Sequence, residues 1–110
     1  MPEQSTREFL ESLNPNPKND LLEKAKGYWS EVESRADDII KPTVGLDHQG
    51  ELLFSWELGE YYFEVEFRKS GIEGFWEIGN INEDTDYGGV DFSDASAAAD
   101  WTIEHFNNAP

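Results

Sequence analysis

The chain has 110 residues, a formal net charge of −16 at neutral pH and no cysteine. This length suits one domain with one hydrophobic core, and the lack of cysteine excludes disulfides, thiolate metal sites and cysteine nucleophiles. No apolar stretch reaches the length of a membrane span, and the first residues lack the basic and apolar regions of a signal peptide. We therefore expect a cytoplasmic protein that forms a single domain over residues 1–110.

The negative charge is concentrated in the C-terminal part of the chain. Residues 1–46 carry nine acidic and six basic side chains, whereas residues 47–110 carry fifteen acidic and two basic ones. Such an excess repels nucleic acid and anionic membranes and attracts cationic partners. Solubility or an acidic host proteome is the alternative explanation, because net charge governs association rather than fold.

Two helices are predicted in the N-terminal part. The stretch Ser5-Thr6-Arg7-Glu8 has the form of a capping box and predicts a short helix over residues 6–13. Two prolines in residues 14–17 end it. Over residues 18–40 the apolar residues recur with the helical period on one stripe, which predicts a long amphipathic helix that ends before Pro42. Asn16 or Asp20 is expected to cap it.

Residues 43–79 predict a four-stranded antiparallel meander. Apolar residues alternate through residues 52–67, and the alternation reverses at Gly59-Glu60, which places Trp56 opposite Phe63 on an apolar face. The stripe of the long helix is expected to cover that face.

The flanking turns of the meander extend the same alternation. A loop that ends at Gly50 is expected to pair Leu46 with Leu52, and a turn at Ser70-Gly71 is expected to pair Phe63 with Ile78. All the turns place the same residues on one face, which favours a single sheet.

The C-terminal part predicts an acidic loop over residues 80–92 and a last helix over residues 94–107, capped by Ser93 or Asp94. On a helical projection Trp101 points away from the other apolar residues of this helix. The expected fold class is therefore α+β: two N-terminal helices, a four-stranded antiparallel meander and a C-terminal helix.

No pattern of catalytic or metal-binding residues is recognisable. The chain has no nucleophile elbow, no glycine-rich phosphate loop and no basic stripe for nucleic acid. His48 and His105 are interpreted as structural residues, since neither has a second histidine at ligand spacing. Residues 82–89 carry oxygen ligands at alternate positions, but Gly88 falls one place too late for a calcium loop and Ser93 stands where its glutamate would be. We expect no cofactor and no metal.

The segment K-P-x-V-x-L-D-x-x-G-E-L-x-F-x-W, residues 41–56, resembles small, mostly uncharacterised bacterial proteins with a P-x-(V/I) strand, a G-E-(I/V/L) turn exit and a closing tryptophan. This resemblance implies a helix-plus-meander fold and brings no catalytic residues. In size and charge the chain is also similar to acidic inhibitor proteins such as antitoxins, immunity proteins and phage anti-defence proteins.

The face of the meander opposite the apolar one combines carboxylates with aromatic rings. The predicted register places Glu64 opposite Glu77 and Arg68 opposite Glu73, and directly opposed like charges cost stability. A solvated face, or a face covered by the first helix, is one explanation. A contact surface for a basic partner is the other. The residues predicted to bind this partner are Glu57, Tyr62, Glu64, Glu66, Phe75, Glu77, Asp84, Asp86, Asp91 and Trp101.

These observations predict a non-enzymatic protein that binds and inhibits a basic, nucleic-acid-handling protein, with carboxylates in place of phosphates. Direct binding of nucleic acid or of a membrane is not expected. The alternative is a structural or accessory subunit of a larger assembly, which would use the outer sheet or an apolar patch around Trp101. An enzyme ranks third among the hypotheses, because no nucleophile, metal set or cofactor loop can be named.

Overall fold

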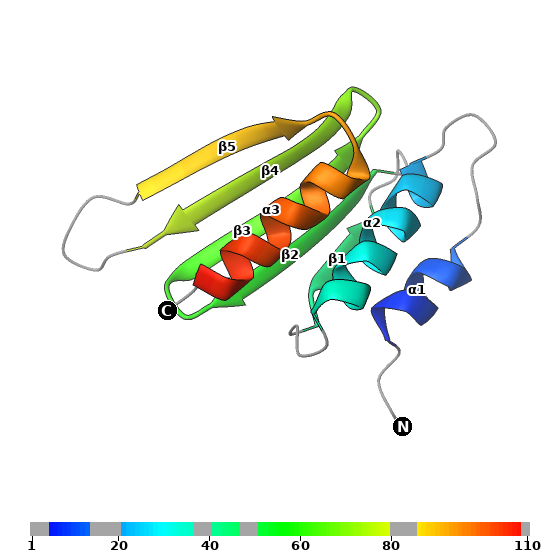
Figure 1. Cartoon of the computed structure of the whole chain (residues 1–110), viewed down its shortest axis with the longest axis horizontal. Coiled ribbons are helices and arrows are strands. Elements are labelled where there is room, and N and C mark those ends of the chain that lie inside the picture. The colour runs from blue at the N-terminus through cyan, green and yellow to red at the C-terminus, as the bar shows by residue number, and fades with distance from the viewer. Residues whose placement is uncertain (1–4, 14–20, 37–40, 47–50, 80–85, 109–110) are drawn as a thin grey trace.

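The described residues of the computed structural model, 5–13, 21–36, 41–46, 51–79 and 86–108, form three helices and one five-stranded sheet. In chain order the elements are α1 (Thr6–Ser12), α2 (Leu21–Arg35), β1 (Thr43–Leu46), β2 (Leu52–Leu58), β3 (Tyr61–Arg68), β4 (Gly71–Ile78), β5 (Asp86–Phe92) and α3 (Ala95–Asn108). The strands lie in sequence order, each antiparallel to the next. Helices α2 and α3 lie side by side against one face of this sheet (Figure 1). The predicted α+β class is confirmed, but the sheet has five strands and not four.

The helix termini follow the predicted caps, with one correction. The Ser5 hydroxyl accepts the backbone N–H of Glu8 at 3.1 Å, as the capping box requires. The Asp94 carboxylate caps α3 by accepting the N–H of Ala97 at 2.8 Å. Helix α2 ends at Arg35, earlier than the predicted end at residue 40. Residues 14–20 and 37–40, with the proposed caps of α2, lie outside the described residues.

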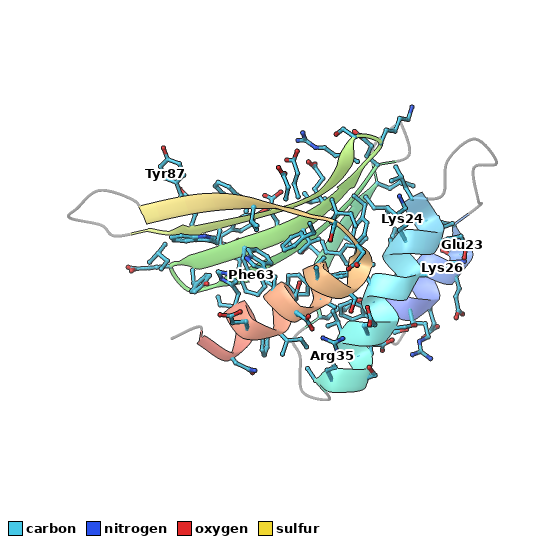
Figure 2. The ribbon with its side chains drawn as sticks, turned by 45° about the horizontal axis from the view of Figure 1, so that its top comes forward. Glu23, Lys24, Lys26, Arg35, Phe63 and Tyr87 are labelled. Carbon is cyan, nitrogen blue, oxygen red and sulfur yellow. The ribbon has the colours of Figure 1, made fainter. Side chains whose placement is uncertain are left out.

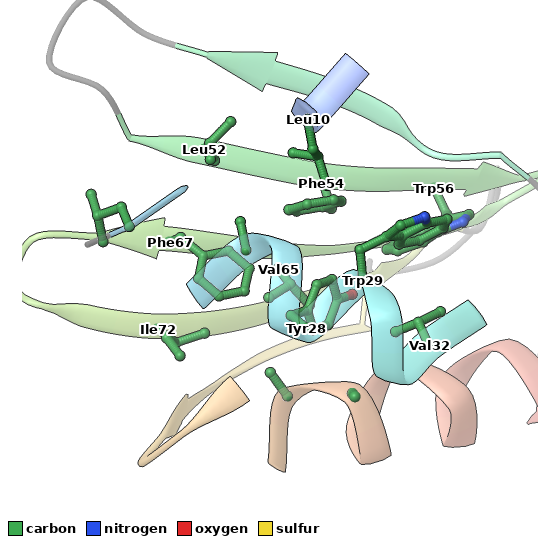
Figure 3. Close-up of a cluster of buried hydrophobic side chains, with 14 of the residues drawn as sticks. Leu10, Tyr28, Trp29, Val32, Leu52, Phe54, Trp56, Val65, Phe67 and Ile72 are labelled. Atoms are coloured by element: carbon green, nitrogen blue, oxygen red, sulfur yellow. The ribbon is translucent and has the colours of Figure 1, made fainter. Parts of the chain in front are cut away.

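The core lies between the sheet and the helices. Trp56 stacks on Phe63 at a centroid distance of 5.1 Å. Trp29 of α2 covers Trp56, with the two ring centroids 6.4 Å apart (Figure 3). The buried Tyr28 hydroxyl is 2.7 Å from the Thr102 hydroxyl, a hydrogen bond that joins α2 to α3. Burial of this apolar face is the main force that holds the layers together. No described helix is long and apolar enough to span a membrane.

The predicted pairings of the first two hairpins are confirmed, and the third is wrong by two residues. Leu46 pairs with Leu52, and Trp56 pairs with Phe63 across a two-residue turn in which Gly59 has a φ of 67°. The last hairpin turns at Lys69-Ser70, so that Phe63 pairs with Trp76 instead of Ile78.

The corrected register changes two predicted cross-strand pairings on the other face of the sheet. Glu64 pairs with Phe75, Glu77 pairs with Tyr62, and Arg68 pairs with Gly71. The opposition of Glu64 and Glu77 and the direct pairing of Arg68 with Glu73 were therefore wrong. A shift by two residues leaves every side chain on its face, so the alternation could not reveal it.

Part of the predicted acidic loop is strand β5. Residues 86–92 pair with β4 from Ile72 to Ile78, whereas residues 80–85 lie outside the described residues. The glycines in β5 hid the strand, because glycine is depleted in strands. The structure explains one of them: a Cβ on Gly88 would lie 2.8 Å from Nε1 of the Trp76 indole. Gly88 is thus the residue that lets Trp76 lie against β5.

Candidate functional site

The candidate site is the face of the sheet opposite the helices, which we call the outer face. Its strand positions alternate with those of the core: Thr43 and Gly45 of β1, Leu53, Ser55 and Glu57 of β2, Tyr62, Glu64, Glu66 and Arg68 of β3, Glu73, Phe75 and Glu77 of β4, and Tyr87, Gly89 and Asp91 of β5. Figure 2 shows Tyr87 pointing away from the helices and Phe63 pointing toward them. Helix α1 packs against α2 in the helix layer, so the idea that it covers the outer face was wrong.

Three carboxylates stand in a row across neighbouring strands of the outer face. Glu66 pairs with Glu73, and Glu73 pairs with Asp91. Neighbouring strands are about 4.8 Å apart, so each pair opposes two like charges at short range. We call Glu66, Glu73 and Asp91 the carboxylate row.

One cation partly offsets the carboxylate row. The guanidinium of Arg68 binds Glu66, and its Nη1 lies 3.7 Å from Glu73. These two carboxylates, Glu66 more than Glu73, raise the pKa of Arg68. Three acidic groups against one basic group leave a net negative charge at this point of the sheet.

Three aromatic rings cross the same face beside the row. The rings of Tyr62 and Phe75 have centroids 6.5 Å apart, and those of Phe75 and Tyr87 are 6.4 Å apart. Tyr87 is 68% exposed, an unusual degree for a large aromatic residue. We call Tyr62, Phe75 and Tyr87 the aromatic track.

Further carboxylates border the aromatic track. The Tyr62 hydroxyl donates a hydrogen bond to Glu64 at 2.8 Å, and Glu57 and Glu77 pair with Tyr62 from the two neighbouring strands. Burial first, and then Glu64, raise the pKa of Tyr62 to about 12. Tyr62 is therefore a neutral hydrogen-bond donor at physiological pH and fixes the Glu64 carboxylate beside the rings.

An open groove of about 470 Å³ lies between the row and the track. It is lined by Glu64, Glu66, Arg68, Glu73, Gly74, Phe75, Gly89, Val90 and Asp91. Gly89 contributes no side chain, and within the described part of the chain a Cβ there would meet only the Gly74 carbonyl oxygen, at 3.6 Å. The absence of a side chain at Gly89 is thus one reason that the groove exists.

The structure brings most of the predicted binding residues together. Seven lie on the outer face: Glu57, Tyr62, Glu64, Glu66, Phe75, Glu77 and Asp91. Asp84 lies outside the described residues, and Asp86 begins β5 opposite Ile78. Sequence reasoning missed Glu73, which it paired with Arg68, and Tyr87, which it assigned to a loop. The alternation of Val90, Asp91 and Phe92 was the only local sign of a strand, and it is too short to stand out beside the two glycines.

Trp101 does not belong to this site. It is partly buried on the helix side of the sheet, where its ring contacts Phe63 at 6.1 Å and Phe92 at 5.6 Å. The expectation of an exposed apolar patch around Trp101 was wrong, because the unpredicted strand β5 supplies Phe92 as a packing partner. Trp101 packs against the core.

His105 lies in the same helix-side layer. Its ring is 4.2 Å from that of Trp101, its Nδ1 is hydrogen-bonded to the Tyr61 hydroxyl, and burial lowers its pKa. Across the described ranges, no three His, Cys, Asp or Glu side chains come together in a way that could hold a metal ion.

Comparison with protein-family models, with curated proteins and with solved structures finds no match for this chain.

Proposed function

We propose that this protein binds and inhibits a basic, nucleic-acid-handling protein through the outer face of its sheet. The carboxylates of that face occupy the surface that the partner offers to phosphates. Toxin neutralisation and inhibition of a defence nuclease are two biological settings for the same physical interaction.

The observation that carries this proposal is the carboxylate row. Opposed like charges on neighbouring strands cost folding stability, and Arg68 offsets only part of that cost. Local violations of the rules of stability are expected at functional sites. The row also places one charge about every 4.8 Å across the strands, a density similar to the one charge per about 3.4 Å along a nucleic-acid strand.

The neighbouring rings and the overall charge support the same conclusion. The aromatic track and the groove provide apolar area that a partner can bury, and aromatic residues dominate the binding energy of many interfaces. The net charge of −13 in residues 47–110 steers a basic protein toward this half of the molecule.

The test compares two variants with the same change in net charge. In the row variant, Glu66→Gln, Glu73→Gln and Asp91→Asn remove the three charges of the row. In the control variant, Glu11→Gln, Glu23→Gln and Glu104→Gln remove three exposed charges from the helices. The partner is captured from the native host with the wild-type protein, and its binding to each variant is measured across a salt series.

We expect the row variant to bind the partner at least about tenfold more weakly, mainly through slower association, and the control variant to bind within about twofold of wild type. The wild-type protein should also displace DNA or RNA from the partner. Equal binding by both variants, without salt dependence, would show that the acidity serves solubility alone. The accessory-subunit hypothesis would then take precedence.

A further inference from the structure

We propose that the gap at Gly89 is a subsite for a single arginine side chain of the partner. This inference rests on the proposed function and adds the chemical identity of the residue that is recognised. The neighbours of Gly89 on the outer face provide apolar, aromatic and anionic groups in close succession.

The register defines the walls of the subsite. Gly89 pairs with Phe75, and on its own strand the nearest residues of the same face are Tyr87 and Asp91. The two aromatic rings are tilted by 33° to each other at 6.4 Å. The groove lining includes Phe75, Gly89 and Asp91, so the gap opens into the groove. A side chain that enters there meets rings on two sides and a carboxylate on the third.

The gap is free of backbone strain and of tight contacts. Gly89 is in an ordinary strand conformation, since the glycines with positive φ are Gly59 and Gly71. Among the described residues, an added Cβ would have one neighbour within 4 Å, the Gly74 carbonyl oxygen at 3.6 Å. Gly89 is therefore not required by the backbone, unlike Gly88, whose Cβ would overlap the Trp76 indole. What glycine provides at this position is space on the outer face.

Arginine matches this environment better than lysine. Its planar guanidinium stacks on aromatic rings and donates two parallel hydrogen bonds to a carboxylate, whereas the lysine ammonium is a strongly hydrated point charge. Here Phe75 and Tyr87 provide the stacking surfaces and Asp91 the carboxylate. Glu73, which pairs with Asp91, adds a second negative charge beside it. Charge complementarity and the two rings, of which Tyr87 is exposed, thus point to the same side chain.

The experiment measures the binding of two synthetic peptides of equal length and charge. One alternates arginine with serine, and the other alternates lysine with serine. The test variant is Gly89→Leu, which fills the gap without a change of charge. The matched control is Gly45→Leu, which adds the same side chain to the same face on the opposite edge strand, where nothing lies within 4 Å of a Cβ. Thermal unfolding verifies that both variants fold.

The wild-type protein should bind the arginine peptide about five- to tenfold more tightly than the lysine peptide. Gly89→Leu should abolish this preference by weakening binding of the arginine peptide to about the affinity of the lysine peptide. Gly45→Leu should preserve the preference, and Phe75→Leu with Tyr87→Leu should remove it as Gly89→Leu does.

Two results would overturn the arginine subsite. One is equal binding of the two peptides to the wild-type protein, and the other is an arginine preference that survives Gly89→Leu. In either case the proposed function still stands if the row variant loses both peptides in a salt-dependent manner. If the wild-type protein binds neither peptide at low salt, the subsite and the proposed function both fail.

Discussion

The outer face depends on the register in which β5 pairs with β4. Two glycines on these neighbouring strands provide a sharp test of that register. In Gly74→Ala, the new methyl group would lie 2.8 Å from Cε2 of Phe92 and 3.2 Å from Cη2 of Trp101. In Gly89→Ala, it would lie no closer than 3.6 Å to any other group, on the opposite face of the sheet. The two substitutions are chemically identical, and neither glycine has a positive φ.

The structure predicts different changes in the free energy of unfolding for the two substitutions. Overpacking of a filled core costs about 1–3 kcal/mol, and replacing glycine by alanine at a compatible backbone recovers about 0.4–1 kcal/mol. Gly74→Ala should therefore lower the free energy of unfolding by about 0.5–2 kcal/mol. Gly89→Ala has no overpacking cost, so only the gain from replacing glycine by alanine remains. It should leave the free energy of unfolding unchanged or raise it by up to about 1 kcal/mol.

The assay is urea unfolding followed by tryptophan fluorescence, with the dependence on urea concentration unchanged between variants as a check on two-state behaviour. The double mutant Gly74→Ala with Phe92→Leu should lose less stability than the sum of the single mutants, because the smaller side chain makes room for the methyl group. Equal effects of Gly74→Ala and Gly89→Ala, or additivity in that double mutant, would show that β5 does not pair with β4 in this register. The groove and the arginine subsite would then have no structural basis.

Two further predictions concern the helix layer. In urea unfolding, Tyr28→Phe should lower the free energy of unfolding by about 0.5–1.5 kcal/mol and Thr102→Val by about 1–3 kcal/mol. The second loss is larger because only Thr102→Val leaves the buried Tyr28 hydroxyl without its hydrogen-bond partner. A larger loss in Tyr28→Phe would contradict this hydrogen bond. His105 has a folded-state pKa lowered by burial, against an opposing effect of Glu104, so the unfolded chain binds its proton more readily. The free energy of unfolding of the wild-type protein, relative to that of His105→Phe, should therefore be at its maximum above about pH 6.5. It should fall as the pH drops from there through the folded-state pKa of His105. A difference between the two proteins that does not vary with pH would exclude this linkage.

Much of the fold follows from local patterns in the sequence. Alternation through β2 and β3 with a glycine turn between them determines which residues face the core and which pair across the hairpin, because a slip by one residue would expose every apolar side chain. The start of α1 follows from Ser5 and Glu8, since a cap is a contact between residues three apart. Part of the outer face was predictable for the same reason, as Glu57, Tyr62, Glu64 and Glu66 lie in these two strands.

The rest was decided by contacts between distant segments. The shift of β4 by two residues keeps the alternation intact, so the alternation cannot decide between the two registers. The packing of β3 and β4 in the folded protein sets the turn at Lys69-Ser70 and pairs Glu66 with Glu73. The glycines of β5 give no strand signal by themselves; the edge of β4 provides the pairing partner, and the indole of Trp76 makes Gly88 necessary. Once β5 is in place it contributes Tyr87 and Asp91 to the outer face and Phe92 to the core against Trp101. Alternation specifies the face on which a side chain lies, whereas its neighbours across the sheet depend on long-range pairing that no local pattern encodes.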